Sequence, residues 1–108
     1  MSEFLTIVTT VDDRAAADAI ARAAVERRLG ACARVFAATS HYRWKGEVES
    51  AEEFVVEIKT TAARRAGLEA MIAEIHPYEL PEIVAHPIFG GSADYLAWLS
   101  EAVADPSS

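Results

Sequence analysis

The sequence predicts an α+β fold, in which an antiparallel sheet carries two main helices on one face. Extended and helical hydrophobic patterns follow one another in the order strand, helix, strand, strand, helix, strand, helix. The two middle strands form a hairpin, so the pattern contains two right-handed β-α-β units joined through it. With 108 residues and no linker or internal repeat, we expect one domain over 1–108 whose ordered core runs from about 4 to 103.

Residues 4–11 predict the first strand, because they are rich in β-branched side chains and almost continuously apolar, which is typical of a strand buried on both faces. Asp12 follows as the predicted N-cap of a helix over 13–29. Gly30 is predicted to end that helix as a left-handed cap. The inward face of the helix is small and apolar and consists of Ala16, Ile20, Ala23 and Ala24.

Residues 33–44 and 48–60 predict the two arms of a long hairpin, with Lys45 and Gly46 in the turn. In the second arm Ile58 is predicted to point into the core, while its two neighbours along the chain point the other way. The base of the hairpin therefore belongs to the central sheet.

The outer half of the hairpin, residues 41–53, is too polar on both faces to be core. Tyr42 and Trp44 would be exposed there on an isolated subunit. Large aromatic side chains on a projecting hairpin favour a contact between subunits over a ligand platform. A cyclic oligomer would cover these aromatic side chains and the strand edges together.

The second helix is predicted to begin at Thr60 or Thr61, one of which would cap it. Its core-facing stripe consists of Leu68, Met71, Ile72 and Ile75. The helix is predicted to end at His76, because Pro77 pushes the residue before it out of helical geometry.

Residues 83–89 predict a fourth strand, with Pro87 at a sheet edge or where the strand leaves the sheet, because proline has no N–H to donate. Gly90 and Gly91 then interrupt the chain, and Ser92 is predicted to cap a third helix. The inward residues of this helix are Tyr95, Leu96, Leu99 and Val103. The complete order is the ferredoxin-like β-α-β-β-α-β arrangement with an extra C-terminal helix.

The charge balance excludes several classes of partner. Ten basic against seventeen acidic residues give a net charge of −7, and no basic cluster is present, so we expect no nucleic-acid partner. No run approaches the roughly 18 apolar residues of a membrane span, and we expect no membrane partner. A single cysteine, Cys32, suits a reducing compartment, and we expect a cytoplasmic protein.

No motif for nucleophilic, zinc or nucleotide chemistry is present, and we therefore expect no enzyme. HExxH, CxxC and GxSxG are absent, and Gly90 and Gly91 lack the spacing of a phosphate-binding loop. Three histidines remain as candidate metal ligands. His41 and His86 are interpreted as surface or packing residues, whereas His76 is the candidate for a metal site.

His76 begins a rigid corner, residues 76–82, which contains two prolines. Two interpretations stay open. In one, His76 caps the last carbonyls of the helix. In the other, it is a ligand or proton carrier beside Tyr78, Glu79 and Glu82. No local spacing supplies three or four ligands, so we expect no tight metal site in one subunit, and either a site shared between subunits or a weak surface site.

Six short segments, in order along the chain, carry a resemblance to a known family. They are IVTT (7–10), RLGACA (28–33), YRWKG (42–46), EIKTT (57–61), HPYELPE (76–82) and DYLAWL (94–99). Together they resemble the CutA family of divalent-cation tolerance proteins, over about residues 4 to 103. The set is collinear and far more specific than one short motif.

This resemblance implies a ferredoxin-like subunit in a tightly packed homotrimer, similar in architecture to the PII signalling proteins. It implies a role in tolerance of copper and other divalent cations. It also implies a cleft between subunits, at which five side chains converge: Tyr42, Trp44, Lys59, His76 and Glu82.

Copper ligands proposed in some bacterial members are a cysteine near the end of the first strand and two adjacent histidines ahead of Pro-Tyr. In this chain Thr9 stands at the cysteine position and Ile75 at the first histidine position, so only His76 remains. A hydroxyl and an alkyl group do not replace thiolate and imidazole, and we expect copper binding at that set to be weakened or lost.

We therefore expect a non-enzymatic, cytoplasmic homotrimer that binds copper(II) or another divalent cation weakly through His76 and has no organic cofactor. The alternative is a PII-like trimer that senses a small molecule in the intersubunit cleft, where Lys59 and acidic groups would meet it.

Overall fold

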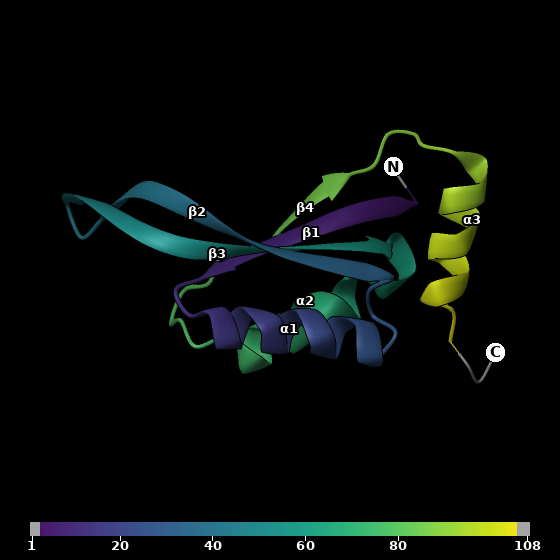
Figure 1. Cartoon of the computed structure of the whole chain (residues 1–108), viewed down its shortest axis with the longest axis horizontal. Helices are drawn as coiled ribbons and strands as arrows, with labels where there is room; N and C mark the ends of the chain where they lie inside the picture. The colour runs from purple at the N-terminus through teal and green to yellow at the C-terminus, as the bar shows by residue number, and fades with distance from the viewer. Residues whose placement is uncertain (1–2, 106–108) are drawn as a thin grey trace.

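The elements follow one another in the order that the sequence predicts, as the computed structural model in Figure 1 shows. The structure describes residues 3–105. The strands are β1 (Phe4–Val11), β2 (Cys32–Trp44), β3 (Glu47–Thr61) and β4 (Val84–Pro87). The helices are α1 (Arg14–Glu26), α2 (Arg65–Ile75) and α3 (Ala93–Ala102), and a 3-10 turn, Ala62–Arg64, precedes α2.

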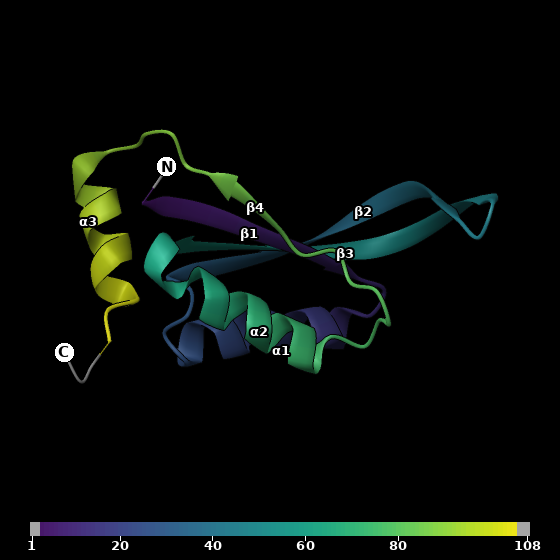
Figure 2. The same ribbon diagram turned by 180° about the vertical axis from the view of Figure 1, so that it is seen from behind.

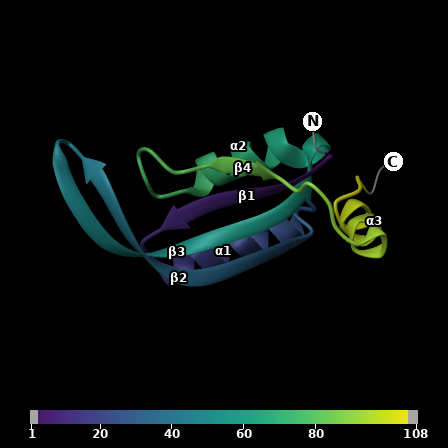
Figure 3. The ribbon, with the colours of Figure 1, turned by 90° about the horizontal axis from the view of Figure 1, so that it is seen from above.

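The four strands form one sheet in the order β2-β3-β1-β4, and all three pairs are antiparallel. Helices α1 and α2 cover one face of this sheet, and α3 lies beyond the end of the sheet where β1 begins (Figures 1, 2 and 3). The opposite sheet face carries no helix along most of its length (Figure 2). The predicted α+β, ferredoxin-like arrangement is confirmed.

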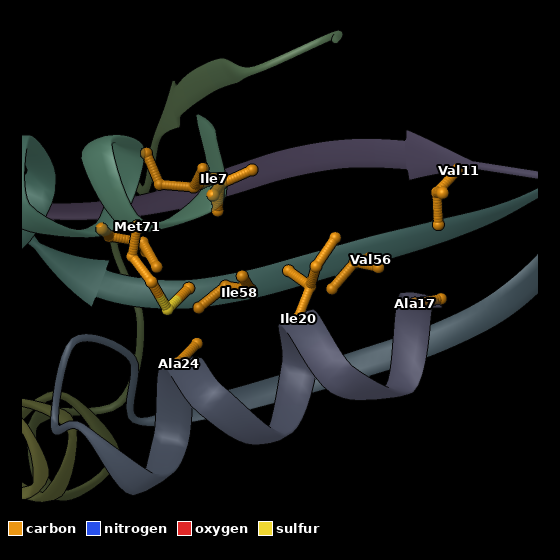
Figure 4. Close-up of a cluster of buried hydrophobic side chains, with 10 residues drawn as sticks. Ile7, Val11, Ala17, Ile20, Ala24, Val56, Ile58 and Met71 are labelled. Atoms are coloured by element: carbon orange, nitrogen blue, oxygen red, sulfur yellow. The ribbon is translucent and has the colours of Figure 1, made fainter. Parts of the chain in front are cut away.

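The core lies between the sheet and the two helices (Figure 4). The burial of β1 alternates along the strand, since Leu5, Ile7, Thr9 and Val11 face the helices and are buried, while the residues between them are half-buried. The prediction of a strand buried on both faces therefore holds for one face only.

Helix α1 begins one residue later than predicted. Asp13, not Asp12, is the N-cap: its Oδ2 accepts a hydrogen bond of 3.0 Å from the backbone N–H of Ala16. The fully buried residues are Ala17, Ile20 and Ala24, while the predicted Ala16 and Ala23 are partly buried against the same core.

The predicted left-handed cap at Gly30 is wrong, because the helix ends at Glu26 and Arg28 takes the left-handed conformation, with φ of 57°. Gly30 is required for a different reason. A Cβ at this position would collide with Cγ2 of Ile58, so only glycine lets the chain after α1 pass this close to β3.

The hairpin is one continuous ladder from the pair Cys32 and Lys59 to the pair Trp44 and Glu47. Lys45 and Gly46 form the turn with φ of 51° and 84°, and these positive values match the twist of the strands. The ladder between β1 and β3 ends at the pair of Val11 and Phe54, so the rest of the hairpin projects beyond the sheet (Figure 1).

Helix α2 has no side-chain cap, which corrects the prediction of a capping Thr60 or Thr61; the 3-10 turn leads into it instead. Its core stripe contains Leu68, Met71 and Ile72. The predicted fourth member, Ile75, is 38% exposed, so the buried stripe ends one turn earlier than predicted. The helix ends before His76, as predicted.

Strand β4 is shorter than the predicted run over 83–89, and it is an edge strand that ends at Pro87, as expected for a residue without an N–H. Ser92 caps α3, with its Oγ 3.2 Å from the N–H of Tyr95. Leu99 and Val103 are buried against Ala31 and form a second small core. The other two predicted inward residues are less covered, and Tyr95 is exposed.

Candidate functional site

The corner after α2 turns the chain from the helix layer towards the outer half of the hairpin. His76 has extended geometry, with φ of −69° and ψ of 133°, as Pro77 requires of the residue before it. Its backbone N–H still bonds to the carbonyl of Ile72, 2.9 Å away. The helix therefore ends at a fixed point, and the next residues run beside the end of β1.

The imidazole of His76 is buried, with 8% of the residue exposed, and both ring nitrogens have partners. The backbone N–H of Tyr78 donates to Nδ1 over 3.1 Å, so Nδ1 carries no proton. In the neutral ring the proton is therefore on Nε2, which donates to the carbonyl of Thr10 over 2.8 Å. The ring thus joins β1 to the corner, and it does not bond to the last carbonyls of α2.

Tyr78 continues this chain of contacts. Its ring packs edge-on against the His76 ring, with centroids 4.8 Å apart. Its hydroxyl donates to Oε2 of Glu53 on β3 over 3.0 Å. Burial, followed by the hydrogen bond to the Glu53 carboxylate, raises the pKa of the Tyr78 phenol above its ordinary value. Tyr78 therefore stays protonated and remains a donor.

A cavity of about 540 Å³ lies between the outer half of the hairpin and the corner. Its lining residues come from the end of β1, both arms of the hairpin and the segment after α2. They are Thr10, Ser40, His41, Tyr42, Trp44, Glu53, Tyr78, Glu79, Leu80 and Glu82. The hydroxyl of Thr10 donates to Glu82 over 3.4 Å, which ties the floor of the cavity to one of its walls.

The lining of this cavity is acidic and aromatic. Among the described residues, the lining contains three carboxylates, those of Glu53, Glu79 and Glu82, and no lysine or arginine. The ammonium of Lys45, which is not among the lining residues, lies 5.9 Å from the centroid of the Trp44 ring. Such a lining favours a positively charged or neutral ligand and disfavours an anion.

The structure brings three of the five predicted cleft residues together, since Tyr42, Trp44 and Glu82 all line the cavity. His76 lies behind it and holds two of its lining residues through its ring. Lys59 does not reach it: this residue pairs with Cys32 and Thr6, towards the opposite end of the sheet. Convergence of all five side chains between subunits stays a prediction.

The described residues, 3–105, contain no group of three or more His, Cys, Asp or Glu side chains arranged to hold a metal ion. At the predicted copper positions, Thr9 is buried on the helix side of the sheet and Ile75 is partly exposed. His41 and His86 are exposed on different strands. Metal binding at His76 stays a prediction. A metal ion would have to replace one of the two hydrogen bonds that the ring nitrogens make.

Glu53 is the site residue that sequence reasoning missed. It lies in the part of the hairpin predicted to be polar on both faces, yet only 8% of it is exposed. The one hint in the sequence is that Glu53 directly precedes the apolar run Phe54-Val-Val, at the point where the hairpin enters the sheet. A carboxylate at this position is a weak indication of burial. Its partner Tyr78 is 25 residues away in the chain, and no local pattern links them.

Within the described residues 3–105, no helix is long and apolar enough to cross a membrane.

Comparison with known proteins gives a consistent result. A family model described as CutA1 divalent ion tolerance protein matches residues 5–102. The chain is 43% identical over 96 residues to the divalent-cation tolerance protein CutA of Thermus thermophilus, covering 88% of this chain and 93% of that protein. It is 40% identical over 102 residues to the CutA homolog of Danio rerio, covering 94% and 67%. The solved structure of a divalent cation tolerance protein from Thermus thermophilus matches with a TM-score of 0.88 at 41% identity, covering 92% and 97%.

Proposed function

The chain belongs to the CutA1 divalent ion tolerance family, and from that premise we propose that it acts as a non-enzymatic homotrimer in cellular tolerance of divalent cations, with copper(II) as the principal cation. The observation that carries the proposal is the family match, which spans residues 5–102 and includes both the corner and the hairpin. A cytoplasmic location belongs to the same proposal, and cell fractionation tests it.

Two features of the single subunit support assembly into a trimer. The outer half of the hairpin is a two-stranded ribbon with unpaired backbone groups on both edges, and exposed edges of this kind invite pairing with another chain. Tyr42 and Trp44 on this ribbon are 44% and 43% exposed. A ring of three copies provides cover for both.

Weak or shared metal binding fits His76 better than a tight site in one subunit. A metal needs a free lone pair on the imidazole. At Nδ1 it would displace the N–H of Tyr78, and at Nε2 it would displace the hydrogen bond to Thr10 after loss of the ring proton. Each route removes a buried hydrogen bond, which costs about 1 kcal/mol or more.

Isothermal titration with copper(II) tests this part of the proposal. The informative variant is His76→Gln, because an amide offers both a donor and an acceptor to the neighbours of the ring but is a poor copper ligand. His86→Ala, on the exposed edge strand, is the matched control. We expect weaker binding in His76→Gln and unchanged binding in the control. Indistinguishable titrations of wild type and His76→Gln would remove His76 from the site.

Growth in rising copper tests the function itself. A strain that lacks its own copy of a family member is complemented with wild type, with His76→Gln or with empty vector. We expect only wild type to restore full growth. Restoration by both proteins would mean that tolerance does not depend on copper at His76, and restoration by neither would count against the proposed role.

A second candidate function is a small-molecule-sensing trimer of the PII type. The observation that favours it is the cavity of about 540 Å³ at the hairpin, which has aromatic walls and several polar groups. Thermal-shift screening against nucleotides, small anions and small cations separates the two candidates. Stabilisation by none of these compounds would count against a sensing role.

A further inference from the structure

Glu53 is a buried carboxylate that forms no salt bridge within the described residues 3–105. The phenol of Tyr78 donates to its Oε2 over 3.0 Å, and this donor is neutral. Glu53 takes part in neither the Arg14–Asp18 nor the Arg65–Glu69 salt bridge. The Arg14 guanidinium lies 5.6 Å from the ring centroid of Phe54, the next residue in the chain, where it forms a cation–π contact. Burial of a carboxylate is unfavourable unless opposite charge or several donors compensate it. The site therefore has unused capacity for a cation.

The other carboxylates of the cavity add negative charge, but the three are not arranged to bind a metal ion. Glu79 and Glu82 stand on the corner, and Glu53 stands on β3 across the cavity. No three carboxylates of the described residues are close enough to hold one metal ion. Negative charge spread around 540 Å³ suits a larger cation whose charge is distributed or carried on an organic group.

The aromatic lining points to the same class of ligand. Tyr42, Trp44 and Tyr78 border the cavity together with the carboxylates. Faces of tryptophan and tyrosine attract ammonium and guanidinium groups, most strongly where water is partly excluded. The Lys45 ammonium, already 5.9 Å from the centroid of the Trp44 ring, shows that a cation is accommodated on this ring.

We infer that this cavity is a subsite for a protonated amine or guanidinium group, with Glu53 as its anchoring carboxylate and the Trp44 and Tyr42 rings as its walls. The inference deepens the second candidate function and rests on it. It specifies an organic cation as the ligand, where sequence reasoning left the choice between anions and cations open.

The cationic group that binds in this cavity has two possible sources. One is a free small molecule. The other is a basic side chain of a second copy of this chain, for which Lys59 is the candidate: it stands half-buried on the sheet face opposite the helices, and its ammonium has no carboxylate partner among residues 3–105. The experiment therefore includes a variant that removes this lysine.

Titration calorimetry with butylguanidinium on the full chain tests the inference, with butylurea as the neutral analogue of the same shape and acetate as the anion. Glu53→Gln removes the charge and retains an acceptor for Tyr78. Glu49→Gln, an exposed hairpin carboxylate outside the cavity, is the matched control. We expect butylguanidinium alone to bind, with affinity reduced about tenfold or more in Glu53→Gln and unchanged in Glu49→Gln.

The Lys59→Gln variant distinguishes the two sources. Binding of butylguanidinium to wild type identifies a site that is open to a free molecule. Binding by Lys59→Gln but not by wild type identifies a site filled by a neighbouring copy. Absence of binding in both, binding that ignores Glu53→Gln, or equal binding of butylurea would overturn the inference. Light scattering on the same samples reports the trimer separately, so a failed assembly is not confused with a wrong ligand class.

Discussion

At the scale of single residues, the imidazole of His76 holds together two parts of the chain that are 66 positions apart. Its Nε2 is bound to Thr10 on β1 and its Nδ1 to the backbone of Tyr78. Through Tyr78 the same network reaches Glu53 on β3. The corner is therefore rigid because of tertiary hydrogen bonds as well as its prolines, and the cavity walls are fixed by the same contacts.

Thr9 carries a buried hydroxyl that has no hydrogen-bond partner within residues 3–105. Thr9→Val removes this unsatisfied group and keeps the shape, so we expect the protein to gain about 1 kcal/mol in free energy of unfolding. Thr60→Val is the matched control, because the equally buried Thr60 hydroxyl donates to the carbonyl of Leu29 over 2.6 Å. This change should destabilise by about 1–3 kcal/mol.

Urea denaturation at one fixed protein concentration measures both threonine variants, since stability of an assembled protein depends on concentration. Equal destabilisation by Thr9→Val and Thr60→Val would contradict the assignment of Thr9 as unsatisfied.

The Tyr78 phenol should make stability fall in alkaline solution. Its pKa is raised in the folded protein, above the ordinary value of about 10 that applies to the unfolded chain. Above pH 10 the folded state therefore binds more protons than the unfolded state, and stability decreases as pH rises. Below pH 10 this contribution is fully present.

We expect Tyr78→Phe to flatten the decrease in stability above about pH 10, while the lost hydrogen bond to Glu53 lowers stability by about 1 kcal/mol at neutral pH. Urea denaturation at several pH values measures both effects. The same alkaline slope in variant and wild type would show that Tyr78 is not responsible.

At the scale of elements, the start of α1 shows how small shifts decide a helix terminus. Asp12 and Asp13 are adjacent and chemically identical, so composition alone cannot choose between them. Asp13 is the cap because its backbone is extended, with φ of −126° and ψ of 126°, which directs its carboxylate at the free N–H of Ala16.

These two aspartates give a matched pair of variants. Asp13→Ala should lower the free energy of unfolding by about 1 kcal/mol through loss of the cap, whereas Asp12→Ala should change it by less than about 0.5 kcal/mol. Thermal or urea unfolding measures the difference. A larger effect of Asp12→Ala would mean that the cap lies one residue earlier, as the sequence pattern predicts.

At the scale of the whole molecule, the single chain has one sheet face covered by helices and one that is largely not. Helices α1 and α2 cover one face of the sheet, while no helix of the described residues 3–105 covers the projecting hairpin or most of the opposite face (Figures 1 and 2). Phe36 and Val84 are exposed on strands, together with the hairpin aromatic residues. A homotrimer is the proposed way in which this surface is covered.

Trp44→Ala should loosen that trimer. An interfacial tryptophan commonly contributes more than about 2 kcal/mol, so we expect dissociation at protein concentrations where wild type remains assembled. Light scattering over a dilution series measures it, and Trp44→Phe, which keeps an aromatic ring, should be affected less. An unchanged mass together with an unchanged melting temperature would contradict a role for Trp44 in the interface.

By itself, the sequence determined the order of the elements, the hairpin turn at Lys45 and Gly46, the end of α2 before His76 and the family. The first three features depend on local physics, since alternation, helical periodicity and the backbone limits of proline and glycine act within a few residues. The family follows instead from the resemblance of six short segments. The same locality explains the failures. The cap at Asp13, the contact that requires Gly30 and the exposure of Ile75 depend on where another element passes.

Only the tertiary structure decided the composition of the site. It separated Lys59 from Tyr42 and Trp44 within one subunit, and it buried Glu53 against Tyr78. In the structure both ring nitrogens of His76 are hydrogen-bonded, whereas the sequence left open whether this residue is a helix cap or a ligand. The physical reason is the same in each case: a side chain acquires its charge environment and its partners from strands and loops that are distant in sequence, and these are fixed only when the sheet has formed.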